Sequence, residues 1–167
     1  MAEALLREEL AAAGVDAHVH SAGLFDDDGR PASEDGVAVM AARGIDTSGH
    51  LSRRMTAEML DHADLVIGMA REHVREAVLT SPDIWTRTYT LKELVRRGTD
   101  VGPRAAGQPL DEWLAKVHAG RTRNDLLGSS AADDVADPIG QPRAVYERTA
   151  DELVALTTRL TSLVKGV

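Results

Sequence analysis

The sequence of 167 residues predicts an α/β fold with a parallel sheet. Short apolar runs alternate with amphipathic helical patterns, which is the arrangement of repeated strand–helix units. The run DLVIGMA (residues 64–70) is almost wholly apolar, as expected of a strand covered on both faces. The segments between these runs are rich in Gly, Pro, Ser and Asp, which favour turns.

Length and composition are typical of one folded domain, which we place at residues 1–167. The net charge of −8 argues against a nucleic-acid partner, because phosphate contacts need clustered Lys and Arg. No apolar run could span a bilayer and no secretory leader is visible, so we expect a cytoplasmic protein without a membrane partner. Cysteine is absent, which excludes disulfides, thiolate metal sites and a cysteine nucleophile within these residues.

The first part of the chain alternates helical and strand patterns. MAEALLREEL (1–10) has helical spacing without a capping residue ahead of it, so we expect a further segment upstream. VDAHVHSAG (15–23) predicts a strand that ends in a loop of small residues. Ser33 and Thr56 are each placed to cap a helix. The apolar strand at 64–70 follows.

The second part continues this alternation. GTDVGPRAAGQP (98–109) is the best linker candidate, because it has little to bury. The remaining elements are expected to be a helix over 71–80, a strand over 84–90, helices over 91–98 and 110–120, and a long amphipathic helix from about Arg143. One face of that last helix holds Tyr146, Ala150, Leu153, Leu160 and Val164. Three strands are few for a sheet buried on both faces, so we expect the upstream segment to include another strand.

Five motifs occur in the order and approximate spacing of the low-molecular-weight protein tyrosine phosphatase family. They are MAEALLREEL, SAG, GIDTSGHLSRRMT, DLVIGMAREHV and DVADPIG. The chain resembles this family over nearly its whole length, apart from 98–130, which we expect to be an insertion. The resemblance implies a phosphotyrosine phosphatase I-like, three-layer α/β/α fold. Family members begin with a strand and a C-x5-R-[ST]-P phosphate loop, so we expect this fold to be incomplete at the N-terminus and poorly stable.

The resemblance also implies a chemistry and assigns residues to it. The family hydrolyses phosphate monoesters through a cysteine nucleophile and an aspartate general acid, without a cofactor. Asp137 in DVADPIG matches that acid, and Pro138 favours an extended conformation that aims its carboxylate. Ser21 and His50 match residues that hold the phosphate loop in shape. Taken alone, the three would be a surface Asp-Pro turn, a turn-capping serine and a solvated histidine.

Departures from the family pattern concern specificity. The residues after Asp137 are Ile139 and Gly140, where tyrosine phosphatases often have aromatic rings, and Phe25 is the only aromatic residue of the loop after SAG. The substrate is therefore open between a phosphorylated protein side chain, a small aryl phosphate and arsenate, as in related reductases.

Two functional hypotheses follow from the missing cysteine. The chain is either a phosphatase that lacks its catalytic loop, and is inactive as given, or a non-catalytic relative that acts as a binding or regulatory module. The reading frame upstream discriminates between them. The oligomeric state is open.

Other polar clusters have simpler interpretations than a metal site. His18 and His20 would share one face of a strand, but no third ligand is evident. The aspartates at 26–28 lack the spacing of a calcium loop. The carboxylates at 133–137 suggest magnesium, but the family resemblance explains Asp137 without a metal. We expect no metal.

Overall fold

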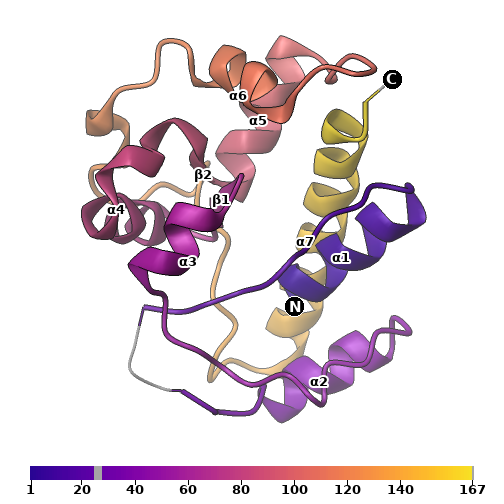
Figure 1. The fold of residues 1–167 in the computed structure, drawn as a ribbon. Coiled ribbons are helices and arrows are strands. Elements are labelled where there is room, and N and C mark those ends of the chain that lie inside the picture. Colours follow the sequence, from indigo (N-terminus) through magenta and orange to yellow (C-terminus); the bar gives the residue numbers. More distant parts are fainter. Residues whose placement is uncertain (25–27, 167) are drawn as a thin grey trace. The chain divides into compact units, whose positions relative to one another are not determined.

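The computed structural model describes residues 1–24 and 28–166, so Phe25, Asp26 and Asp27 lie outside the described residues. The chain divides into two compact units. Figure 1 labels the helices and strands of both. Unit 1 comprises Met1–Arg54 and Ala136–Thr161. Unit 2 comprises Met55–Val135 and Ser162–Val167.

Unit 1 contains helices α1 (Ala2–Ala12), α2 (Glu34–Ala41) and most of α7 (Arg143–Val164). The cap predicted for α2 is confirmed, because the Ser33 Oγ accepts a hydrogen bond from the Gly36 N–H at 3.3 Å. Helix α1 begins without a side-chain cap, as its sequence predicts. The long C-terminal helix begins where the sequence places it.

The core of unit 1 joins its helices through a small apolar cluster. Val39 of α2 packs with Tyr146 and Ala150 of α7, and Met1 packs against them. Leu153 and Leu160, on the predicted apolar face of α7, are also buried. The start of α1 is thereby held against the first turns of α7.

The strand predicted at 15–23 is wrong in its regular form. Within the described part of unit 1, this segment makes only an isolated parallel bridge, between Gly23 and Arg54. Most of its side chains are exposed. A strand requires a neighbour that pairs with its N–H and C=O groups residue after residue, which an apolar–polar alternation alone does not supply.

Unit 2 contains the sheet. Its elements are α3 (Ala57–His62), β1 (Val66–Gly68), α4 (Arg71–Thr80), a 3₁₀ helix (Pro82–Arg87), β2 (Thr88–Thr90), α5 (Leu91–Val101), α6 (Leu110–His118) and a second 3₁₀ helix (Arg123–Leu126). Strands β1 and β2 pair in parallel, with Val66 opposite Thr88 and Gly68 opposite Thr90. The predicted cap of α3 is confirmed, since the Thr56 Oγ1 accepts from the Met59 N–H at 3.2 Å.

Two boundaries in unit 2 differ from prediction. The strand expected at 84–90 is confined to β2, because Pro82 starts a 3₁₀ helix ahead of it. The linker expected from residue 98 begins later, because α5 continues to Val101. Gly98 lies inside this helix, where a Cβ would come within 3.0 Å of the Trp113 ring.

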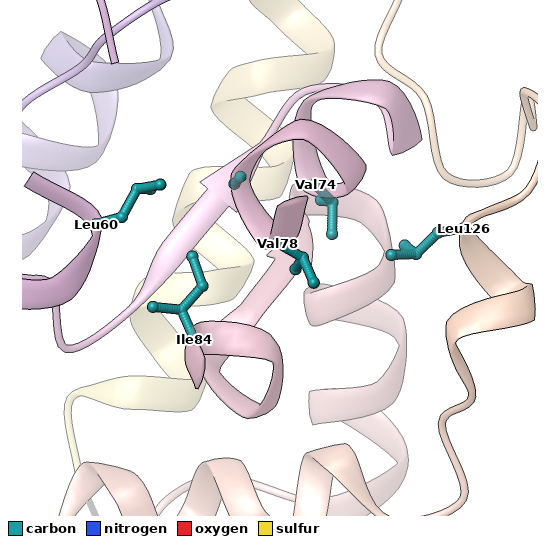
Figure 2. Close-up of a cluster of buried hydrophobic side chains, with 6 residues drawn as sticks. Leu60, Val74, Val78, Ile84 and Leu126 are labelled. Atoms are coloured by element: carbon teal, nitrogen blue, oxygen red, sulfur yellow. The ribbon is translucent and has the colours of Figure 1, made fainter. Parts of the chain in front are cut away.

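The apolar core of unit 2 forms between its helices and strand β1. Figure 2 shows side chains from α3, α4 and the two 3₁₀ helices converging beside the strands. The buried cluster consists of Leu60, Val74, Ala77, Val78, Ile84 and Leu126, with Met55, Val66 and Trp85 packed against it. This core fixes α4 at the carboxyl end of β1, as in a strand–helix unit.

Candidate active site

Glu3 is the centre of a polar network at the first turn of α1. The Ser21 hydroxyl donates a hydrogen bond of 2.5 Å to Oε2 of Glu3, and the Arg7 guanidinium donates one of 3.0 Å to Oε1. The His50 Nδ1 lies 3.8 Å from the same Oε2. The structure therefore brings together Ser21 and His50, the two residues that the sequence pairs, and it joins them through Glu3.

The carboxylate of Glu3 is kept ionised by these neighbours. Partial burial raises the pKa of Glu3, but the hydrogen bond from Ser21 and the nearby charges of His50 and Arg7 outweigh this effect. The net result is a pKa of Glu3 below its ordinary value. A carboxylate in the first helical turn also interacts favourably with the positive end of the helix dipole.

Asp137 lies in an exposed turn that leads to α7. Its Oδ1 accepts a hydrogen bond from the Ile139 N–H at 3.0 Å, and the adjacent Pro138 is buried. The carbonyl of Ala136 accepts from the Thr149 hydroxyl of α7 at 3.4 Å. Within the described part of the chain, the Oδ2 of Asp137 has no partner. The turn thus orients the carboxylate through one of its two oxygens.

Asp133 has a structural role that the sequence reasoning missed. Its buried carboxylate accepts hydrogen bonds of 2.7 Å from Arg71 Nη2 and from Arg96 Nη1. Burial raises the pKa of Asp133, but the two guanidinium groups outweigh it and hold the pKa below its usual range. A carboxylate engaged by two arginines is a poor ligand for a cation.

Asp134 is also used within unit 2. Its Oδ1 accepts from the Arg71 N–H at the start of α4, and its Oδ2 accepts from the Ser130 N–H, both at 2.8 Å. Among the described residues, no three His, Asp or Glu side chains form a group that could hold a metal ion. The rings of His18 and His20 lie 5.2 Å apart, centroid to centroid.

The described helices include none that is long and apolar enough to cross a membrane.

The sequence reasoning gave no side-chain role to Glu3. Its signal was an acidic residue in the first turn of α1, which is common in helices of every kind. Its position relative to Ser21 and His50 depends on the tertiary fold, which no local pattern describes.

A sequence model of the family described as "Low molecular weight phosphotyrosine protein phosphatase" matches residues 1–101. The chain belongs to this family. Two curated members are similar to it. One is the protein-arginine-phosphatase of Geobacillus stearothermophilus, 32% identical over 96% of this chain and 83% of that protein. The other is the probable low-molecular-weight protein-tyrosine-phosphatase EpsP of Ralstonia solanacearum, 32% identical over 72% of this chain and 80% of that protein.

Solved structures of family members share the fold. The low-molecular-weight protein tyrosine phosphatase from T. tengcongensis is 32% identical, with a TM-score of 0.70 over 95% of this chain and 86% of that chain. A mutant of YwlE from Bacillus subtilis is 25% identical, with a TM-score of 0.69 over 96% of this chain and 85% of that chain. These findings confirm the predicted family and its α/β fold.

Proposed function

We propose that this chain supplies the proton donor and the supporting network of a phosphate-monoester hydrolase. Asp137 is the general acid, and Ser21 and His50 support the phosphate-binding loop through Glu3. The observation that best supports this proposal is the convergence of Ser21 and His50 on one carboxylate at the amino end of α1. An amino-terminal helix end is where phosphate groups are commonly bound.

The mechanism has two steps, and Asp137 acts in both. A cysteine attacks phosphorus while Asp137 protonates the departing oxygen, and Asp137 then removes a proton from the water that releases phosphate. The 167 residues contain no cysteine, so the attacking group is not among them. The Ile139 N–H fixes Oδ1, which leaves Oδ2 to exchange the proton.

The proposed substrate is a phosphorylated protein side chain of the phosphotyrosine type. Phosphoarginine is a second candidate, because the named arginine phosphatase aligns over 96% of this chain and EpsP over 72%. Ile139, which is 67% exposed two residues after Asp137, is aliphatic and offers no aromatic face on which a substrate ring could stack. We propose action in the cytoplasm on such a protein, or on a small aryl phosphate, without a cofactor.

The domain assignment is also a proposal. We infer one family domain over 1–167 with an insertion at 98–130. The match to the family ends at residue 101, close to where the insertion is proposed to begin.

The upstream reading frame tests the proposal first. A frame that encodes a strand and a Cys-x5-Arg loop directly ahead of Met1 is the expected result. An in-frame stop codon there would contradict it and favour the non-catalytic relative.

The extended protein then tests Asp137 through the leaving group. Asp137→Asn should lower kcat/KM by about 10²–10⁴-fold for phenyl phosphate, because kcat/KM reports the step in which the leaving group departs and phenolate is a poor leaving group without a proton. The loss should be smaller for p-nitrophenyl phosphate, whose leaving group needs less protonation. Asp16→Asn, at an exposed aspartate of the same unit, is the matched control. Equal losses for both substrates would argue against a proton donor.

Phosphotyrosine and phosphoarginine peptides, compared by kcat/KM, decide between the two candidate substrates.

A further inference from the structure

We propose that Arg53 is a positioning residue, which sets the Ser21 hydroxyl against Glu3 and so maintains the network that supports the phosphate-binding loop. This inference rests on the proposed function for the purpose of the network. The network itself is a feature of unit 1 and can be measured without catalysis.

Arg53 contacts the Ser21 segment at two points. Its Nε donates a hydrogen bond of 2.8 Å to the carbonyl oxygen of Ser21. Its own carbonyl oxygen accepts from the Gly23 N–H at 2.9 Å. Because one bond uses the side chain and the other the main chain, the two together fix both the position and the direction of residues 21–23.

The need for such a clamp follows from the segment itself. Residues 15–22 make no regular ladder among the described residues of unit 1, and most of their side chains are exposed. A hydroxyl at the end of an unpaired segment loses rotational and backbone freedom when it binds a partner, and that loss opposes the bond. Arg53 offsets it by holding the backbone of Ser21 in place beforehand.

Arg53 also links Ser21 to His50. Arg53 and His50 lie three residues apart in one loop. Leu51, which lies between them, makes an antiparallel bridge with Pro31. Because the loop that holds Ser21 also carries His50, Arg53 fixes the position of the serine relative to the histidine. The Ser21 hydroxyl hydrogen-bonds the Oε2 of Glu3, and the His50 Nδ1 lies 3.8 Å from the same oxygen.

The planar guanidinium suits this task. Arg53 is exposed, so its charge is screened by solvent and contributes little as an ion pair. Arg53 acts instead through an N–H donor whose direction is fixed by the planar guanidinium, which a lysine ammonium reproduces only in part.

The test is a titration of the Glu3 carboxyl by carbon-detected NMR in the 167-residue chain. Arg53→Ala and Ser21→Ala should each raise the Glu3 midpoint, because the hydroxyl that stabilises the carboxylate is then unplaced or absent. The double variant should shift no further than Ser21→Ala alone, since Arg53 acts through Ser21. Arg53→Lys should raise the Glu3 midpoint less than Arg53→Ala does, because the lysine keeps a donor near the Ser21 carbonyl. Arg148→Ala, at an exposed arginine of α7, should leave the midpoint unchanged.

Three results would overturn the inference, two from the titration and one from the fold of the variants. The first is an unchanged Glu3 midpoint in Arg53→Ala. The second is shifts that add in the double variant, which would mean that the charge of Arg53 acts on Glu3 directly. If Arg53→Ala fails to give a native amide spectrum, Arg53→Met, which keeps the aliphatic stem, takes its place, and unfolding of both would also reject a positioning role. Failure of the proposed function would appear in the phosphatase assays and leave this titration unaffected.

Discussion

Gly98 is predicted from the sequence to end a helix, but the structure places it inside one. A glycine within a helix ordinarily costs about 1 kcal/mol relative to alanine, which made this position resemble a helix end. In the structure it lies inside α5, and a Cβ there would come within 3.0 Å of the Trp113 ring and 3.1 Å of a Leu163 methyl. The absence of a side chain is what allows the indole to pack against α5.

Gly98→Ala should therefore destabilise the protein although alanine favours helices. The Trp113 ring is fully buried and its Nε1 donates to the Gly102 carbonyl at 2.9 Å, so it cannot move aside freely. We expect a loss of about 1–3 kcal/mol in the free energy of unfolding, measured by urea denaturation. Gly49→Ala, where a Cβ meets nothing within 4 Å, is the control and should be close to neutral. A stabilised Gly98→Ala variant would show that α5 and Trp113 separate easily.

Elements of unit 2 are joined by ion pairs as well as by apolar packing. Asp133 ties the segment before Val135 to α4 through Arg71 and to α5 through Arg96. Val135 continues this attachment, since its N–H donates to the Met69 carbonyl at 2.7 Å, just beyond β1. The segment is thus fixed at several points in succession.

Asp133→Asn should weaken this attachment in a pH-dependent way. The folded state lowers the pKa of Asp133, so its stabilising effect is complete above the unfolded pKa, about 3.9, and is lost as the pH falls through the folded value. At pH 7 we expect Asp133→Asn to lower the free energy of unfolding by about 1–3 kcal/mol, because two guanidinium donors lose a charged acceptor. The difference from the wild type should shrink in acid. Asp83→Asn, at an exposed aspartate of the same unit, is the control. A difference that stays constant down to acidic pH would contradict the assignment.

Elements were predictable from the sequence where their cause is local. The caps at Ser33 and Thr56 depend on a side chain and a backbone N–H three residues apart, and both are confirmed. The strand at 15–23 depends on a distant partner, so its apolar–polar alternation was insufficient. The contact between Gly98 and the Trp113 ring also joins residues distant in the sequence, so no local pattern predicts it.

The candidate site divides in the same way. Asp137, Ser21 and His50 lie in motifs of the family and were named from them. Glu3 and Arg53 were given no role, because their importance depends on contacts with Ser21. The roles of all five in catalysis stay predictions.

At the scale of the whole molecule, a general acid is too weak to act alone. Asp137 would contribute about 10²–10⁴-fold, or about 3–5 kcal/mol of transition-state stabilisation. Enzymes that hydrolyse phosphate monoesters lower the barrier by about 20 kcal/mol or more. The difference is supplied by the nucleophile and the phosphate-binding loop, and a chain without cysteine has no thiolate for the first of these.

The 167-residue chain should therefore show no turnover of p-nitrophenyl phosphate above the buffer rate. Iodoacetamide, which inactivates cysteine-dependent phosphatases by alkylating the thiolate, should leave that rate unchanged, because the chain has no thiol to modify. The extended protein, if the upstream frame encodes the loop, is the positive control in the same assay. Turnover by the 167-residue chain that Asp137→Ala abolishes would contradict the mechanism, because it would mean that another residue of this chain attacks phosphorus.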